Sequence, residues 1–273
     1  MISFDKTLHK YKKGNIIYRS VTQLIELYKP KFNKEYWSLY KSLQAYLKLE
    51  KPEFKAYLYS NIPHFQWNED ILKLENLIIK KGIKYSDLKV EEKLNEWADI
   101  NKKACDLGTE VHDTLEGIDI ANKSSTINGN TSALISHPNY THLDDGSYTE
   151  LRLYFDKYRL AGTADKVRIY TEKNVRYFDI EDYKTNQKIT FENPFQKLLY
   201  PLDHLEDTKF NIYALQMSIY SYMLEQQFSL KYKHSNIIHF QNYDTNNGIV
   251  YPTPYLKKEV IALLKHYKDN HGS

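Results

Sequence analysis

The order of hydrophobic patterns along the 273 residues predicts an α/β or α+β fold with a helical elaboration at the N-terminus. Apolar residues recur at helical spacing through most of the first third of the chain. Three β-rich runs separated by short turns follow, and this pattern is typical of an antiparallel meander. A helix, two strands and a final helix come next, so we expect sheet and helices to share one core.

The first third of the chain is predicted to be mainly helical. Ser20 stands where it can cap a helix that carries Leu24 and Ile25 on its apolar side. Helical spacing also extends over three further ranges, which are about 34–49, 69–79 and 90–115. We therefore expect a helical region over 1–103 and the main core over 104–273.

The elements of the core follow a loop-rich stretch. Residues 121–147 are rich in Ser, Thr, Asn and Asp, so we interpret them as an irregular excursion inside one domain. The runs of the predicted meander cover about 148–158, 162–170 and 175–184. The elements expected after them are a helix over 207–228, strands over 235–244 and 248–254, and a helix over about 255–268.

Lysine is frequent in the predicted helical region. The residues concerned are Lys10, Lys12, Lys13, Lys29, Lys31 and Lys34. They are compatible with an arch or clamp over a nucleic-acid strand, and equally with a solvated basic helical face. The net charge of +3 permits a polyanionic partner without requiring one.

Composition narrows the class of protein further. About two-fifths of the residues are apolar, which is enough for a substantial core. The single cysteine, Cys105, indicates a reducing compartment and leaves no thiolate set for a zinc or iron–sulfur site within this chain. No apolar run approaches the roughly 20 residues that span a bilayer, and the N-terminus lacks an apolar signal segment. We expect a soluble, cytoplasmic protein with no membrane partner.

The stretch "FDIEDYKT", residues 178–185, places acids and a lysine in a predicted strand. Side chains alternate between the faces of a strand, so Asp182 and Lys184 project together, beside Phe178 and Ile180. Asp179 and Glu181 then point to the opposite face. A register shifted by one residue would instead turn Glu181 and Tyr183 inward, and we regard it as the less favourable alternative because Phe178 and Ile180 need the core.

Asp165, in "LAGTADKVRIY", precedes Asp182 by one strand of the meander. Neighbouring strands lie about 5 Å apart, so the two carboxylates are expected to converge. A divalent cation such as Mg²⁺ would relieve their repulsion and lower the pKa of a bound water, which suits phosphodiester hydrolysis. Lys184 would position or deprotonate that water and add further positive charge. The alternative is structural: Asp165 caps a turn, and Asp182 and Lys184 form a surface pair.

Two helical pairs accompany these residues. Gly108 and Thr109 are interpreted as opening a new helical turn that aligns His112 with Glu116. A histidine close to two acids is a reasonable third ligand and favours Mn²⁺ alongside Mg²⁺. Gln216 and Tyr220 share a helical face by the same spacing, and they can hydrogen-bond a phosphate or stack on a nucleotide. Taken alone, each pair is equally compatible with an ordinary amphipathic helix.

Five short motifs occur in one order along residues 104–224. They are "GTEVH" (108–112), the Glu150 of "TELRLY", "GTAD" (162–165), "DYKT" (182–185) and "QMSIY" (216–220). Together they resemble the motifs of PD-(D/E)XK nucleases, most closely the RecB-type exonuclease branch. The run is similar to phage-encoded and mitochondrial genome-maintenance exonucleases, and "YRSVT" near the start resembles the N-terminal entry of that group.

The resemblance implies a central mixed β-sheet flanked by helices, with one or two Mg²⁺ or Mn²⁺ ions and no iron–sulfur cluster. The metal ligands that it implies are His112, Asp165, Asp182 and the Tyr183 carbonyl. The catalytic residues that it implies are Lys184, Asp165 and Asp182, with Glu150 supporting the metal or water network. The DNA contacts that it implies are Gln216, Tyr220 and Thr185.

The sequence therefore predicts a metal-dependent DNA nuclease, more specifically an exonuclease on single strands or free ends in replication, recombination or repair. Its partner would be DNA, and its place would be the host cytoplasm if a phage encodes it. An endonuclease of the same fold and a nucleic-acid-binding subunit that does not cut are the alternatives. The presence of Asp165, Asp182 and Lys184 argues against the non-cutting subunit.

Overall fold

The computed structural model describes residues 2–5, 8, 10–65 and 70–271. The chain forms two compact units, one of Met1–Pro30 with Asp106–Ser273 and one of Lys31–Cys105. The expected boundary at residue 103 falls close to the observed one, but the helical region does not start at residue 1. The first 30 residues belong to the unit that contains the sheet, because they supply three of its strands.

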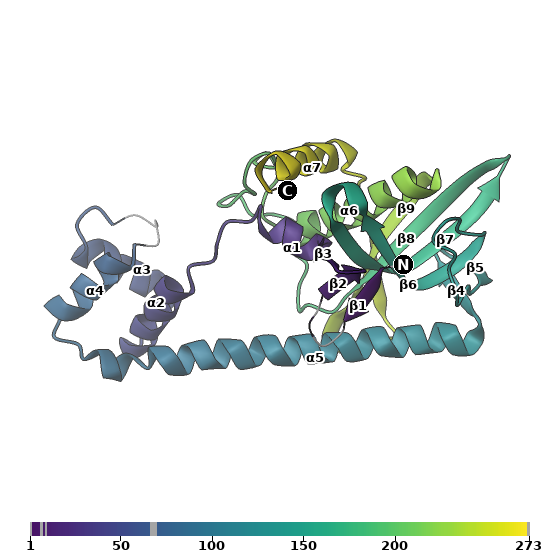
Figure 1. The fold of residues 1–273 in the computed structure, drawn as a ribbon. Helices are drawn as coiled ribbons and strands as arrows, with labels where there is room; N and C mark the ends of the chain where they lie inside the picture. The colour runs from purple at the N-terminus through teal and green to yellow at the C-terminus, as the bar shows by residue number, and fades with distance from the viewer. Residues whose placement is uncertain (1, 6–7, 9, 66–69, 272–273) are drawn as a thin grey trace. The chain divides into compact units, whose positions relative to one another are not determined.

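A mixed sheet forms the centre of the first unit, as predicted (Figure 1). Its strand order among the described residues is β1 (Ser3–Asp5), β2 (Lys10–Lys13), β3 (Ile16–Ser20), β7 (Leu160–Glu172), β8 (Val175–Lys184), β9 (Lys231–Phe240) and β10 (Gly248–Pro252), and β6 (Gly146–Phe155) also pairs with β7. The β3–β7 and β8–β9 pairs are parallel, and the other pairs are antiparallel.

Strands β6, β7 and β8 form the antiparallel meander that the sequence predicts. Only Lys173 and Asn174 separate β7 from β8, and both have positive φ, at 48° and 62°. Such a turn matches the right-handed twist of the paired strands. The turn therefore sets the register that pairs Lys166 with Glu181.

Helices α1 (Val21–Glu26), α6 (Lys209–Phe228) and α7 (Lys257–His271) pack on one face of the sheet and share its main apolar core. Ser20 caps α1 as predicted, through a reciprocal capping box with Gln23. Phe178 and Ile180 lie in the same core, which confirms the strand register inferred from the sequence. The described residues include no helix with the length and apolar character that a membrane crossing demands.

Helix α5 (Val90–Asn122) covers part of the other face of the sheet, where Val111 packs against Tyr183 and Phe240. The helix continues through Gly108, so the new helical turn expected there does not exist. Its residues 106–122 belong to the first unit, and its earlier residues to the second.

The second unit is helical, as expected. It contains α2 (Lys34–Tyr46), α3 (Lys51–Asn61), α4 (Ile71–Lys80), the short η1 (Tyr85–Leu88) and the start of α5. Leu39, Leu43, Phe54, Leu58 and Leu74 are fully buried in a core of its own. Glu69, where one predicted helix begins, lies outside the described residues.

Two predictions about the chain are corrected. Lys10, Lys12 and Lys13 lie on strand β2 of the first unit, so the basic residues do not form one helical face. The excursion over 121–147 is not wholly irregular, because β4 (Ser124–Ile127) and β5 (Asn130–Ala133) form a hairpin inside it.

Candidate active site

The candidate site lies where strands β7 and β8 stop pairing. The ladder ends at Lys166 and Glu181, one residue before Asp165 and Asp182 would face each other. Beyond that point, Oδ2 of Asp165 accepts a hydrogen bond of 2.7 Å from the backbone N–H of Tyr183. The carboxylate therefore replaces the missing strand partner and lies at the opening between the two strands.

Two further ligand groups approach Asp165 from neighbouring elements. Nδ1 of His112, on α5, lies 3.5 Å from Oδ2 of Asp165. Glu150, on β6, sits in the position opposite Asp165, with a left-handed φ of 49°. One ligand atom from each of these three residues lies within 4.8 Å of the others. Helix α5 and strands β6 and β7 thus bring together an imidazole and two carboxylates.

Lys184 and Asp182 form an ion pair beside this group. Both side chains are largely enclosed, at 15% and 3% exposed respectively. The Lys184 ammonium also lies 4.8 Å from the ring centroid of Tyr213 on α6, at a distance suited to a cation–π contact. Oδ2 of Asp182 is buried and accepts no hydrogen bond, although the Lys184 ammonium lies beside it.

The pKa of Asp165 is raised to about 6, first by burial and then by the Asp182 carboxylate. His112 and Lys184 oppose this rise but do not cancel it. Burial alone would lower the pKa of Lys184, whereas Asp182 and Asp165 raise it above its usual value. The two acids therefore favour the ammonium form of Lys184 in the metal-free structure.

Two motif glycines allow close approach at the site. A Cβ atom at Gly162 would lie 2.5 Å from Cε1 of Tyr220, closer than any real contact of this kind. A Cβ atom at Gly108 would lie 3.0 Å from Oγ1 of Thr185, which is also tight. These glycines let the Tyr220 ring reach β7 and let α5 reach the end of β8.

The motif on α6 braces the site. Nε2 of Gln216 donates a hydrogen bond of 3.3 Å to the hydroxyl of Tyr220, and both residues are buried. The Tyr220 ring is only 3% exposed, so it has no free face for stacking on a base, and that expected role is corrected to packing on Gly162. Gln216 and Tyr213 line a pocket of about 390 Å³, so the predicted contact between Gln216 and DNA has a surface available.

Asp179 and Glu181 point away from the site, as expected, and both are buried. Oδ1 of Asp179 lies 2.9 Å from Nδ1 of His234, and Oε1 of Glu181 accepts a 2.8 Å hydrogen bond from the Asn128 backbone. The Lys166 ammonium forms an ion pair of 2.7 Å with Oδ2 of Asp119 on α5. The sequence reasoning missed this buried polar layer because it did not place α5 and the β4–β5 hairpin over that face.

The residues present suit a hard divalent cation. Mg²⁺ and Mn²⁺ can be coordinated by carboxylate oxygens together with one imidazole nitrogen. Burial and the neighbouring Asp182 carboxylate raise the pKa of Asp165, so a cation bound between these acids would stabilise the ionised form of Asp165. The three-residue group includes Glu150, which the expected ligand set did not, and leaves out Asp182, whose carboxylate pairs with Lys184. It consists of side-chain ligand atoms, so it does not test the expected Tyr183 carbonyl.

Comparison of the chain with models of protein families found no match, and comparison with curated proteins found none.

Proposed function

We propose that the protein is a metal-dependent DNA nuclease with a PD-(D/E)XK core, and that it acts as an exonuclease on single strands or free DNA ends. The observation that carries the proposal is the convergence of His112, Glu150 and Asp165 beside the Asp182–Lys184 ion pair. If Asp165 only capped a turn and Asp182 and Lys184 only formed a surface ion pair, these groups would be exposed to solvent and far apart. Here Asp165, Asp182 and Lys184 are largely enclosed, and the partly exposed His112 and Glu150 lie close to Asp165, so α5 and three strands contribute to one group.

The proposed site combines ligands for a divalent cation with the positive charge of Lys184. His112, Glu150, Asp165 and, across the opening, Asp182 would hold Mg²⁺ or Mn²⁺, with the Tyr183 carbonyl as a further proposed ligand. When bound, the ion would lower the pKa of a water molecule and offset charge on the phosphate. The Lys184 ammonium, held beside Asp182, would stabilise the negative charge that develops on the phosphate oxygens.

Contacts among Tyr213, Asn186 and His239 surround Lys184 and the end of β8. The ring of Tyr213 faces the ammonium, and the Tyr213 hydroxyl donates a 3.0 Å hydrogen bond to Oδ1 of Asn186. The Asn186 carbonyl lies 2.6 Å from Nε2 of the buried His239. Because His239 is also the strand partner of Lys184, these contacts close a ring around the end of β8.

The test is cleavage of end-labelled single- and double-stranded DNA in Mg²⁺, Mn²⁺ or EDTA. EDTA abolishes cleavage, and Lys184→Ala lowers the rate by about 100-fold or more, the scale of a lost preorganised charge. Lys231→Ala, which removes an exposed lysine from the start of β9, is the matched control and keeps the wild-type rate. Cleavage by Lys184→Ala at the wild-type rate would refute the role given to this lysine.

A covalently closed single-stranded circle separates exonuclease from endonuclease action. An enzyme that needs free ends leaves the circle intact while it degrades the linear form of the same sequence. Nicking of the circle would replace the exonuclease proposal by an endonuclease of the same fold.

A further inference from the structure

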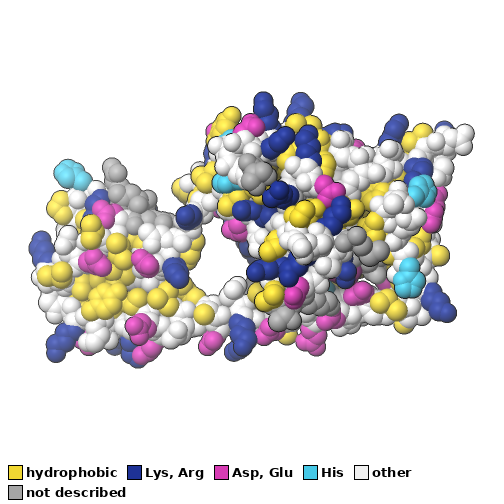
Figure 2. Space-filling model, in the orientation of Figure 1, with side chains coloured by type: hydrophobic (Ala, Val, Ile, Leu, Met, Phe, Trp, Pro, Cys, Tyr) yellow, Lys and Arg dark blue, Asp and Glu magenta, His cyan; other side chains and the backbone are white. Residues whose placement is uncertain are grey.

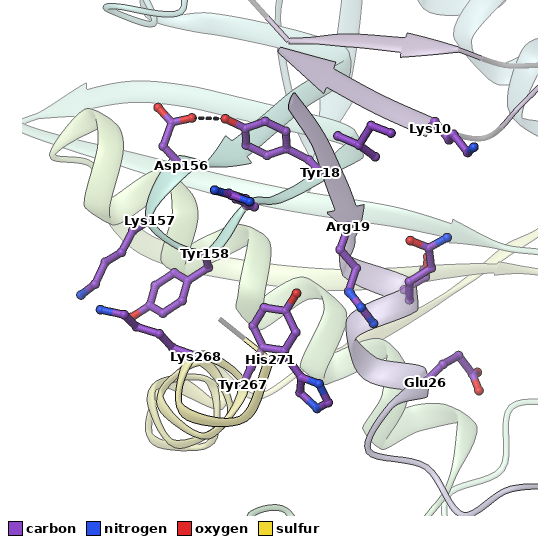
Figure 3. Close-up of a pocket in the computed structure, with 14 residues that line it drawn as sticks. Lys10, Tyr18, Arg19, Glu26, Asp156, Lys157, Tyr158, Tyr267, Lys268 and His271 are labelled. Carbon is purple, nitrogen blue, oxygen red and sulfur yellow. Dashed lines mark hydrogen bonds between the residues drawn. The ribbon is translucent and has the colours of Figure 1, made fainter. Parts of the chain in front are cut away.

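A second concave surface of the first unit lies apart from the candidate active site. It is a hollow of about 930 Å³ lined by β3, α1, α7 and the short η2 (Asp156–Tyr158) with the residues beside it (Figure 3). On the face shown in Figure 2, Lys and Arg side chains gather over α7 and the N-terminal strands. A hollow of this volume is within the range of ligand-binding sites.

The hollow carries an excess of positive charge. The cationic residues in its lining are Lys10, Arg19, Lys157, Arg159 and Lys268, against two acids. Glu26 pairs with Lys29 at 2.5 Å, and Asp156 pairs with Lys13 at 2.7 Å. Both acids are therefore compensated by lysines that do not line the hollow. The positive potential of the lining stays available for an anionic ligand.

Local structure holds two of the cations together. The backbone N–H of Arg19 donates a 2.9 Å hydrogen bond to the carbonyl of Arg159, so the two arginines lie on adjacent chain segments. The Arg19 guanidinium lies 5.6 Å from the ring centroid of Tyr267, which packs it against α7. In Figure 3, the side chains of Lys157 and Lys268 end on the same side of the hollow. Tyr158, between these groups, is half-buried, and the Lys157 ammonium lies 5.2 Å from the centroid of its ring.

The position of the hollow relates it to the candidate active site. Arg19 pairs with Leu160, five residues before Asp165 on β7, which corresponds to about 17 Å along the strand. Thr22 and Glu26 of α1 line both this hollow and the smaller pocket that contains Gln216 and Tyr213. Helix α1 is therefore a wall shared by the two concave surfaces, and they lie within the span of a site of four or more nucleotides.

We propose that this hollow binds the phosphodiester backbone of single-stranded nucleic acid, a few nucleotides away from the bond that is cut. The choice of nucleic acid as the polyanion rests on the proposed nuclease function, whereas the anion site rests on the lining itself. Arginine and lysine bind phosphate oxygens, so the cations that line the hollow suit a phosphodiester backbone.

The experiment measures binding without cutting. A fluorescein-labelled oligothymidylate of 20 nucleotides is titrated with the full chain in EDTA. Its fluorescence anisotropy is measured at several salt concentrations. Lys157→Ala with Lys268→Ala removes two phosphate contacts. It weakens binding by about tenfold and reduces the slope of log K against log salt by about 1.4, at about 0.7 for each contact. The matched control is Lys258→Ala with Lys265→Ala, which removes the same charge from α7 outside the hollow and leaves Kd and slope at the wild-type values.

Each result decides between the two proposals separately. Wild-type affinity of the Lys157→Ala/Lys268→Ala variant, or equal weakening in both double variants, overturns the binding site. Equal affinity for polyglutamate of the same length overturns its assignment to nucleic acid. If the wild type does not cleave DNA but the hollow variant binds oligothymidylate weakly, the nuclease proposal fails and the binding site stands. If the wild type cleaves and the hollow variant binds normally, only the binding site fails.

Discussion

Gly162→Ala is expected to destabilise the first unit, because the new methyl group has no space beside Tyr220. The added Cβ atom would lie 2.5 Å from Cε1, 2.8 Å from the hydroxyl oxygen and 3.0 Å from Cζ of that ring. The ring is buried at 3% exposure and cannot swing into solvent. Overpacking of this kind costs about 1–3 kcal/mol. For a unit of this size, that lowers Tm by roughly 2–12 °C.

Thermal unfolding followed by circular dichroism measures this effect, with Gly117→Ala as the matched control. Gly117 lies inside α5, and a Cβ atom there would meet nothing within 4 Å. The control should therefore gain about 0.5–1 kcal/mol from the better helix former. In a Tyr220→Leu background, the cost of Gly162→Ala should shrink, because the obstructing ring is gone. An unchanged Tm for Gly162→Ala, or the same cost in both backgrounds, would refute the close-approach argument.

Two other predictions concern the charged groups. Without metal, the pKa of Asp165 is raised from 3.8 to about 6, so this group stabilises the fold fully below pH 3.8 and loses that contribution as pH rises through about 6. The difference between the two pKa values corresponds to about 3 kcal/mol of folding free energy. In EDTA, the Tm of Asp165→Asn should therefore fall much less than that of the wild type between pH 4 and pH 8. Equal falls in Tm for the two proteins would contradict this prediction. Tyr213→Leu should slow DNA cleavage by about 5–30-fold, the equivalent of a desolvated cation–π contact of about 1–2 kcal/mol, while Tyr213→Phe keeps the ring and most of the rate. Equal cleavage rates for the Leu and Phe variants would show that the Tyr213 ring does not contribute through its contact with Lys184.

The sequence was sufficient for the elements whose pattern is local. Alternation along β8 correctly placed Phe178 and Ile180 in the core and Asp182 with Lys184 on one side, because strand periodicity alone determines these faces. The capping residue Ser20 was equally predictable, because a side chain that bonds a backbone three residues away leaves a short-range signal.

Non-local pairing explains most of what was missed. Strands β1, β2 and β3 are only three to five residues long, and β3 joins the sheet through β7, about 140 residues further along the chain. Their short length and the lysines around them gave no strand pattern that the sequence could show. The contact between Tyr213 and Lys184 is also non-local, since α6 must dock before the ring faces the ammonium.

The β4–β5 hairpin was missed for a different reason. Asn128 and Gly129 connect its strands with positive φ, at 48° and 71°. An Asn-Gly pair is the strongest short-range hairpin signal, and here it lay in a stretch interpreted from composition alone. The turn also delivers the Asn128 backbone N–H to Glu181, so this local signal would have led to the buried polar layer.

The hydrogen bond from Tyr183 to Asp165 gives one carboxylate two duties, since it ends the strand pairing as well as belonging to the proposed metal site. Replacing Asp165 by alanine would thus leave a backbone amide unsatisfied and shift the end of β8 along with Lys184. An asparagine retains an acceptor oxygen there. A variant intended for trapping the proposed substrate should therefore carry the amide, because the end of β8 would keep its wild-type geometry.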